Sequence, residues 1–424
     1  MGKEPGLIRP AESREDVEHA ARLLSSPAIK AFADEQRDEP GSIRLLTQNG
    51  DPVGAIAHRR EYWELGSARL KVARAWECTG EFGDHSFRRT GNRSEFDALV
   101  ADWLTSLSEN GYHLAYAHGE LALWPTHGFV PSFFHARVLV PVSRALTLKA
   151  SHRVRPLRRS DSRHVAKLMK KNRRYRPRVF ATGVPNFNHY VVEALDKTIV
   201  GYFSLGLLDG PRQPKVFLPE VETADRAVAE TILAWAAPHA RKRGVGALTF
   251  PLAADHPFAR VCIDLGGYHQ IRGASRDVTL DEEMVRVIDV RAVFEALESN
   301  FALRLAEAGV SGEPRELTLV VDEERVPLLL DPKGIRPIEE TSSKTVVSLP
   351  RWAFTQLVMG YRTGADLPPD TVSPNGAVRL LNTLFPKTWP LSLCDHDIWD
   401  PAMKDRDKYV PAAREALKQI RLLY

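Results

Sequence analysis

The chain has 424 residues, which is more than one compact core usually supports, so roughly two or three domains are expected. Apolar residues make up 43% and charged residues 26%, a composition typical of a globular protein that folds in water. The formal net charge of +4 permits an anionic ligand but does not require a nucleic acid.

The cysteines and the N-terminus indicate the compartment. The three cysteines are far apart and form no Cys-x-x-Cys pair, so neither a zinc site nor a disulfide framework is predicted. The N-terminal residues MGKEPGLIRP carry no apolar signal core, and no apolar run approaches the ~18 residues of a membrane span. We therefore expect a cytoplasmic protein with no metal site and no membrane association.

An internal repeat organises most of the chain. Segments beginning at Leu7 and at Arg153 share an apolar-Arg-Pro triplet, a polar turn and then Asp-x-x-His-x-Ala-x-Leu. Each segment predicts a short strand, a turn and an amphipathic helix that begins near Asp16 or Asp161.

Later landmarks follow in the same order in both copies. A Val-Gly pair enters a strand-like run in the segments from Pro52 and from Ile199. A polar helix end, a glycine and then an apolar strand occur in SENGYHLAYA from Ser108 and in RKRGVGALTF from Arg241. These landmarks predict two copies of one α/β unit.

The repeat also sets the expected domain boundaries, with the first unit over residues 1–150 and the second over 151–284. Residues 285–424 are predicted to form a third domain of mixed α and β structure, with strand-like runs LTLVVD, RVPLLLD and KTVVSLP. Its helix RWAFTQLVMG is expected to end at Gly360. A last amphipathic helix, PAAREALKQIRLLY, is expected to dock on this domain or on another subunit.

An arginine-rich glycine turn precedes a helix-like pattern in the first unit. It reads Arg88-Arg89-Thr90-Gly91-Asn92-Arg93, and the helix begins near Ser94. Unpaired N–H groups and the helix dipole suit a phosphate at such a helix start, and Gly91 lets the backbone approach it closely. Arginine side chains can add charge-assisted contacts. The alternative interpretation is a solvated basic turn that caps the helix.

The order of these elements resembles the GNAT superfamily of acetyl-CoA-dependent N-acetyltransferases. The family motif Gln/Arg-x-x-Gly-x-Gly/Ala corresponds to the turn from Arg88 to Arg93, and GELALWPTHGF from Gly119 resembles the family segment with an aromatic residue before Gly-Phe. Two such units followed by a sterol-carrier-protein-like domain resemble the Eis-type acetyltransferases, and RVIDV at Arg286 and QLVMGYRTGADL at Gln356 fit that third domain.

The resemblance implies an α/β (α+β) fold with two tandem GNAT-like mixed-sheet domains and a sterol-carrier-protein-like α+β domain. It implies acetyl-CoA as cosubstrate in the first unit, bound by Phe82, Gly83, Arg88, Arg89, Thr90, Gly91, Asn92 and Arg93. Arg93 departs from the motif, which usually has Gly or Ala there. The second unit has the acidic segment PEVETADRAVAETIL from Pro219 at the equivalent place, so we expect a degenerate, structural copy without cofactor.

Acetyl transfer to a lysine-like amine needs a group that removes a proton, because such amines have a pKa near ~10. A backbone N–H within VARAWECTGEF, from Val72, is the candidate for stabilising the oxyanion. Eis-type enzymes use a Tyr before the Gly-aromatic loop and the C-terminal carboxylate. Here Trp124, which can donate a hydrogen bond but not a proton, stands at that place, and the chain continues from Trp399 to Tyr424.

Other side chains are candidates for these roles. Glu120 matches a Glu of the family segment, and Glu77 and Glu81 lie on or near the central strand, where other GNAT members place a catalytic Glu. His118 lies close to Glu120 and titrates in the useful range. Glu120, Glu77 and Trp124 are the predicted catalytic residues. For the carboxylates of Glu120, Glu77 and Glu81 the alternative is a solvated side chain, and for His118 it is a surface or core histidine.

The predicted function is acetyl transfer to the primary amine of an aminoglycoside-like small molecule, a polyamine or a lysine. The alternative is a pseudoenzyme that binds coenzyme A or a protein partner. The Lys- and Arg-rich run from Arg153 to Phe180 can follow nucleic-acid phosphates, but its charges are predicted to lie on exposed faces of the strand and helix that open the second unit. The apolar strands of the third domain are predicted to be core rather than a lipid pocket, and a homo-oligomer is compatible with the sequence.

Overall fold

The computed structural model of the chain describes residues 6–23, 39, 41–80, 93–120, 124–133, 135–172, 187–209, 214–218, 221–250, 252, 256–272, 281–310, 313–331 and 333–388. The chain folds as two compact units, of which the first contains Met1–Ser132 and Thr279–Pro386 and the second contains Phe133–Val278.

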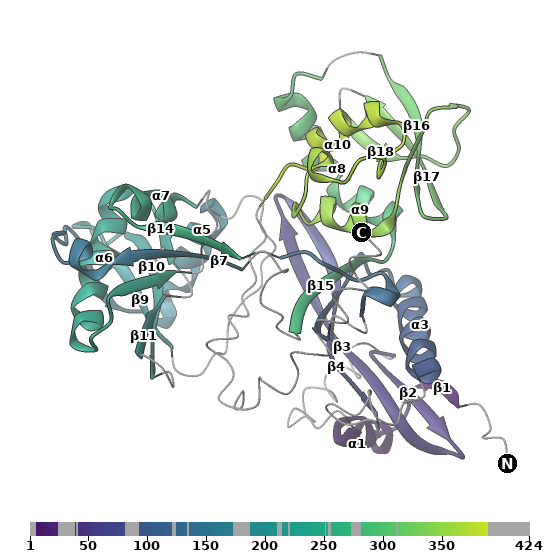
Figure 1. The fold of residues 1–424 in the computed structure, drawn as a ribbon, viewed down its shortest axis with the longest axis horizontal. Helices are drawn as coiled ribbons and strands as arrows, with labels where there is room; N and C mark the ends of the chain where they lie inside the picture. Colours follow the sequence, from purple (N-terminus) through teal and green to yellow (C-terminus); the bar gives the residue numbers. More distant parts are fainter. Residues whose placement is uncertain are drawn as a thin grey trace. The chain divides into compact units, whose positions relative to one another are not determined.

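A mixed sheet forms the centre of the first unit (Figure 1). In the described residues its strand order is β1 (Leu7–Pro10), β2 (Ile43–Gln48), β3 (Asp51–Leu65), β4 (Ala68–Gly80), β5 (Leu114–Glu120), β15 (Asp281–Val287) and β6 (Val130–Pro131). Neighbouring strands are antiparallel except for β4 and β5, which are parallel.

Two helices cover opposite faces of this sheet because the apolar side chains of β3 alternate. Helix α1 (Arg14–Leu23) packs with Ala55 and Ala57, whereas α3 (Arg93–Glu109) packs with Ile56 between them. The short helix η2 (Trp124–His127) lies on the α3 side. The first core is therefore a layer of helix on each face of a twisted sheet.

The second unit repeats this sheet. In the described residues its strand order is β8 (Arg153–Pro156), β9 (Phe187–Glu193), β10 (Ile199–Asp209), β11 (Pro214–Phe217), β13 (Ala247–Phe250), β7 (His135–Pro141) and β14 (Tyr268–Arg272), and β12 (Val221–Thr223) also pairs with β10. Its helices are α4 (Val142–Ala145), η3 (Arg159–Asp161), α5 (Ser162–Asn172), α6 (Arg226–Lys242) and α7 (Pro257–Asp264). Among the described strands of this sheet, β11 and β13 form the parallel pair, at the place that β4 and β5 hold in the first sheet.

The two units exchange one strand. The sixth position of the first sheet is filled by β15, which follows the second unit in sequence, and the sixth position of the second sheet is filled by β7, which precedes all the other strands of that unit. The chain therefore changes sheets before β7 and before β15. The expected boundaries at 150 and 284 come from the sequence repeat and do not coincide with these changes, because β7 lies before residue 150 and β15 spans residue 284.

The repeated Arg-Pro and Asp residues have the same structural role in both units. In the first unit Arg9 donates to both carboxylate oxygens of Asp16, at 2.9 and 2.6 Å, and to the carbonyl of Pro10. In the second unit Arg155 donates to both oxygens of Asp161, at 2.7 and 3.0 Å, and to the carbonyl of its own following proline. The repeated motif therefore ties the first strand of each unit to the helix that follows it.

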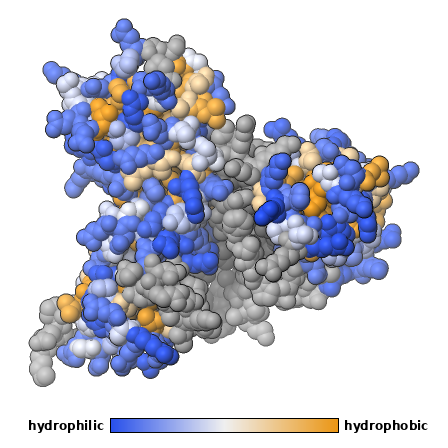
Figure 2. All heavy atoms as spheres, turned by 180° about the vertical axis from the view of Figure 1, so that it is seen from behind, coloured by the Kyte–Doolittle hydropathy of each residue, from blue (hydrophilic) through white to orange (hydrophobic). Residues whose placement is uncertain are grey.

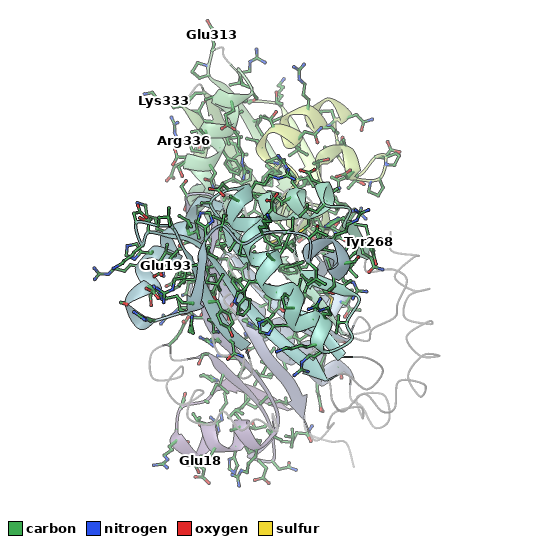
Figure 3. All side chains as sticks on the ribbon, turned by 90° about the vertical axis from the view of Figure 1, so that its left-hand side faces the viewer. Glu18, Glu193, Tyr268, Glu313, Lys333 and Arg336 are labelled. Atoms are coloured by element: carbon green, nitrogen blue, oxygen red, sulfur yellow. The ribbon has the colours of Figure 1, made fainter. Side chains whose placement is uncertain are left out.

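The arginine–aspartate pair of the second unit has an additional carboxylate. Arg155 also donates to Glu193 on β9, at 2.5 Å, and the arginine side chain is only 11% exposed (Glu193 is labelled in Figure 3). The expectation that the basic run lies on exposed faces is wrong for this residue, because the two carboxylates draw its guanidinium onto the sheet. Arg153 and Arg163 are exposed as expected.

Replacing the aspartate of this pair, Asp16 or Asp161, by asparagine is expected to destabilise the unit that contains it. The pKa of Asp16 and that of Asp161 lie below the ordinary value, chiefly because of the arginine hydrogen bonds. The contribution of each carboxylate to the free energy of unfolding is therefore fully present above the unfolded pKa of about 3.9. It is lost as the pH falls toward the lower pKa of the folded state. Asp161→Asn should lower the unfolding free energy by about 2 kcal/mol at pH 7, measured by urea denaturation.

Asp16→Asn is the matched substitution in the first unit, where the hydrogen bonds of Arg9 among the described residues reach no carboxylate besides Asp16. Both variants should lose less stability than the parent protein between pH 5 and pH 3. A parallel shift of the whole pH curve would show that these carboxylates do not titrate with folding.

The predicted glycine ends of the helices are confirmed in both units. Gly111 and Gly244 both have φ of 67°, in the left-handed region that favours glycine. After each glycine the next N–H bonds back into the helix, Tyr112 to Leu107 and Val245 to Ala240, both at 3.0 Å. The chain thus turns sharply from helix α3 or α6 into the next buried strand.

The C-terminal part of the first unit is a separate small sheet with helices. In the described residues the sheet order is β18 (Gly334–Pro337), β17 (Glu324–Asp331), β16 (Arg315–Val321) and β19 (Val346–Leu349). The helices are α8 (Val290–Glu307), α9 (Arg351–Val358) and α10 (Val378–Leu384), with short turns η4 (Gly364–Asp366) and η5 (Asn375–Ala377). The three predicted strand runs and the predicted helix before Gly360 are confirmed.

This part is filled by aromatic side chains. Phe294, Phe301, Phe354 and Phe385 are at most 1% exposed, and their ring centroids lie 5.2–6.2 Å apart. This packing favours the prediction that the apolar residues are core. The predicted last helix lies outside the described residues, so its docking stays a prediction.

Apolar residues on the surface are dispersed. Figure 2 shows small groups of them among hydrophilic residues on the face that it displays. The exposed large apolar residues in the described part of the chain are Leu7, Tyr62, Leu195, Ile263, Tyr268, Leu303 and Val310. They lie on separate elements and indicate no single docking surface. None of the helices in the described part has the length and apolar character of a membrane span.

Candidate functional site

Strands β4 and β5 separate in the middle of the first sheet. Their parallel ladder joins Val72, Ala73 and Arg74 to the residues from Leu114 to Tyr116 and ends there in the described strands. Beyond this point β4 continues to Gly80, paired with β3, and β5 continues to Glu120, paired with β15. Within the described strands, the backbone edges of β4 and β5 past Tyr116 do not pair with each other, and such an opening between two strands can accept an extended ligand.

Helix α3 is the element that follows β4 in the described part of the chain. The helix begins at Arg93 and has 17 residues, so its N-terminal N–H groups and dipole favour an anion. The predicted cofactor residues Phe82, Gly83, Arg88, Arg89, Thr90, Gly91 and Asn92 lie outside the described residues, and of Arg93 the structure describes only the backbone. Their role stays a prediction, supported by the place of the helix.

Strand β4 carries a bulge beside the opening. Ala57 pairs with Glu77 and His58 pairs with Ala75, so Trp76 is an extra residue on β4. Such a bulge redirects backbone N–H groups, which supports the expectation that this strand can stabilise an oxyanion.

The predicted carboxylates lie on the two strands that border the opening. Glu77 lies on β4, and Glu120 is the last residue of β5, opposite Asp281. His118 lies opposite Glu283 of β15. The structure gives the backbone positions of these residues but not their side chains, and Glu81 lies outside the described residues.

Trp124 is part of the core. It is 5% exposed and packs against Phe96 and Trp103 of α3 and against Phe129, with ring centroids 5.0–6.2 Å apart. Ala115 and Ala117 of β5 belong to the same cluster, so Trp124 lies on the face of the sheet that α3 covers. The structure thus shows Trp124 as a packing residue of the core, a role that the sequence did not suggest, and its part in the reaction stays a prediction.

A buried hydroxyl–carboxylate pair that sequence reasoning missed lies where β4 and β5 separate. Tyr116, the last residue of the β4–β5 ladder, donates from its hydroxyl to Oε1 of Glu283, at 2.7 Å. The two residues are 2% and 4% exposed. Ala115 and Ala117 face α3, so Tyr116 points to the opposite face of the sheet. The pair joins strands 167 residues apart in sequence, so no local pattern could reveal it.

The second unit differs at the corresponding helix start. Asp225 caps α6, and its Oδ1 accepts the N–H of Val228 at 2.9 Å. A carboxylate of the chain thus occupies the place where an anionic ligand would bind, and it would repel a phosphate. This cap supports the prediction that the second unit is a structural copy without cofactor.

Comparison with solved structures identifies the fold. A probable N-acyltransferase from Enterococcus faecalis matches with TM-score 0.70 and 12% identity, covering 91% of this chain and 98% of its own. A GCN5-related N-acetyltransferase from Anabaena variabilis matches with TM-score 0.68 and 13% identity, covering 91% and 99%. Eis1 from Mycobacterium abscessus matches with TM-score 0.61 and 16% identity, covering 92% and 99%.

The chain has the fold of these three proteins. At these low identities the likeness concerns the fold, and it extends over nearly the whole length of each related protein. No protein-family model matches the sequence, and no curated protein matches it either. The resemblance to Eis-type proteins is thus confirmed as a likeness of fold.

Proposed function

We propose that this protein is an acetyl-CoA-dependent N-acetyltransferase with one cofactor site per chain, in the first unit. The observation that carries the proposal is the separation of β4 from β5 after Tyr116, beside a bulged strand that leads to the N-terminus of α3. A linear cofactor with amide groups can pair with the open strand edges while its phosphates meet the helix N-terminus.

The proposed acceptor is a primary amine of an aminoglycoside-like molecule, a polyamine or a lysine. The predicted residues Arg88, Arg89, Gly91 and Arg93 would hold the pyrophosphate, and Glu77 and Glu120 border the opening. The second candidate function, a pseudoenzyme that binds coenzyme A or a protein partner, is favoured by Trp124, whose core packing leaves the usual Tyr position without a proton donor. A cytoplasmic location, the absence of nucleic-acid binding and possible homo-oligomerisation remain proposals from the sequence.

Coenzyme A is expected to bind once per chain and to bind roughly 100-fold more weakly to Gly91→Glu, because the new carboxylate repels the pyrophosphate and blocks its hydrogen bonds. Isothermal titration calorimetry gives both the stoichiometry and the affinity. Ala224→Glu is the matched control, since Ala224 is exposed just before the cap of α6 in the second unit. It should change neither quantity.

Thiol release from acetyl-CoA with spermidine, an aminoglycoside and a lysine peptide then distinguishes the two functions. Turnover with any of these amines supports the transferase. Binding of coenzyme A without turnover on all of them favours the pseudoenzyme, and equal affinity of Gly91→Glu and the parent protein would contradict the phosphate turn.

A further inference from the structure

Glu283 lies in a position that a structural carboxylate rarely occupies. Its Oε1 accepts the hydroxyl of Tyr116, but its Oε2 is buried and has no hydrogen-bond partner in the described part of the chain. A buried polar atom without a partner costs about 1–3 kcal/mol, and more when it is charged. Such an atom needs either an explanation within the fold or a donor that arrives with a ligand.

The register places this carboxylate beside the opening. Val285 is the residue of β15 directly opposite Tyr116, and Glu283 is two residues farther along the same face, opposite His118. In this direction β5 has already left β4. The Glu283 carboxylate therefore lies at the level where the strands are apart, on the face opposite α3.

The surroundings hold Tyr116 in one orientation. Its ring packs edge-on against Trp63, with centroids 5.6 Å apart, and the guanidinium of Arg74 lies 5.2 Å from the ring centroid. Arg74 in turn pairs with Glu61 at 3.4 Å, and Glu61 accepts from the Trp63 indole. Among the described side chains, the charges beside Tyr116 on the neighbouring strands are thus Arg74 and Glu61, which pair with each other. His118, of which only the backbone is described, lies opposite Glu283 on β5. The Oε2 atom of Glu283 has no hydrogen-bond partner there and is left for a cation that arrives with a ligand.

We propose that Glu283 receives the ammonium group of the acceptor substrate and removes its first proton, and that Tyr116 is the positioning residue that holds the carboxylate. This inference rests on the proposed transferase function and names its acceptor site. The site selects an amine that is cationic at neutral pH, since a buried carboxylate is best satisfied by a charged donor.

The proton balance of the step is complete. The ammonium gives one proton to Glu283 Oε2, and the neutral nitrogen forms the C–N bond with the acetyl carbonyl carbon. The C–S bond then breaks, and the second N–H proton leaves with the thiolate sulfur, which gives the amide and free coenzyme A thiol. Glu283 returns its proton to solvent, so the cycle releases one proton for each ammonium consumed.

The test is Glu283→Gln, which keeps the shape of the side chain and its bond to Tyr116 but cannot take a proton. With an amine accepted by the parent protein, kcat/KM for thiol release at pH 7 should fall by about 100-fold, while coenzyme A affinity is unchanged. The deficit should shrink as the pH approaches the amine pKa of about 10, because the free amine no longer needs the base. Glu18→Gln removes an exposed carboxylate of α1, which pairs with Arg14 on the same helix, and should leave kcat/KM close to that of the parent protein.

Tyr116→Phe keeps the ring packing and removes only the hydroxyl, so it tests the pair if Glu283→Gln fails to fold. It should raise KM for the amine more than it lowers kcat, with a deficit that also shrinks at high pH. The proposal is overturned if the folded Glu283→Gln protein keeps full activity. If that variant does not fold, full activity of Tyr116→Phe overturns it instead. Either result leaves the transferase function standing. A deficit of equal size at every pH also overturns the proposal, because that result marks a structural role. A parent protein that binds coenzyme A but acetylates no amine overturns both proposals together.

Discussion

Lowering the pH from 7 to 5 is expected to remove about 2 kcal/mol of stability through His58 alone. Burial lowers the pKa of this imidazole to about 4, whereas the unfolded value is about 6.5. Between these two values the unfolded chain takes up a proton that the folded chain does not, so the stability falls as the pH falls. His113, whose pKa is also lowered chiefly by burial, adds a loss of the same sign.

The hydrogen bonds of His58 give the same result independently of its burial. The indole of Trp103 on α3 donates to Nδ1 at 3.0 Å, and indole is only a donor, so Nδ1 must be unprotonated. Nε2 lies 3.0 Å from the hydroxyl of Tyr112 and therefore carries the proton. A second proton, on Nδ1, would place the N–H of the imidazole and the N–H of the Trp103 indole opposite each other, so this hydrogen bond between α3 and β3 would be lost.

The measurement is the unfolding free energy by urea denaturation at pH 7 and at pH 5, for the parent protein and for His58→Gln. The glutamine lowers stability at both pH values but does not titrate. The loss of unfolding free energy from pH 7 to pH 5 should therefore be about 2 kcal/mol smaller in the variant than in the parent protein. An unchanged loss would mean that His58 becomes charged within the folded protein. The result decides whether the polar contacts under α3 break in mild acid.

The repeat could be read from the sequence because its key residues act locally. Arg9 and Asp16, like Arg155 and Asp161, are close in sequence and bond to each other, so the same spacing recurs wherever the same strand, turn and helix form. The strand exchange could not be read in this way. HARVLVP of β7 and DEEMVRV of β15 are both short strands with alternating apolar residues, and such a pattern predicts a strand without saying which sheet it joins.

The candidate site was only partly readable for the same reason. The helix after the predicted phosphate turn is continuous in sequence, so the pattern could place the helix, whereas the turn itself lies outside the described residues and stays a prediction. Tyr116 and Glu283 meet only because β15 enters the first sheet, which no pattern near either residue reveals. A weak signal existed in hindsight, since Glu283 is a charged residue at an alternating position of a strand whose next inward residues, Val285 and Val287, are fully buried.

Asn300→Ala is expected to lower the unfolding free energy by about 3 kcal/mol, because two backbone groups of the β3–β4 turn would lose their partner. Asn300, on α8, is 3% exposed. Its amide donates to the carbonyl of Leu65, and its Oδ1 accepts the N–H of Ser67 at 3.0 Å and the Ser67 hydroxyl at 2.8 Å. Between them Gly66 has φ of 63°, and a Cβ added there would lie 2.6 Å from Asn300 Oδ1, so the side chain fits closely over the turn.

Ser299→Ala is the matched control on the same helix. The Ser299 hydroxyl also contacts Ser67, at 2.9 Å, but this contact is exposed, and water replaces it at little cost. Urea denaturation should therefore give a large loss for Asn300→Ala and a loss near zero for Ser299→Ala. Equal losses would show that water serves the turn as well as the asparagine does. Because the turn lies at the end of β4 remote from the opening, the affinity for coenzyme A should stay unchanged in both variants, so the loss of stability can be separated from any loss of binding.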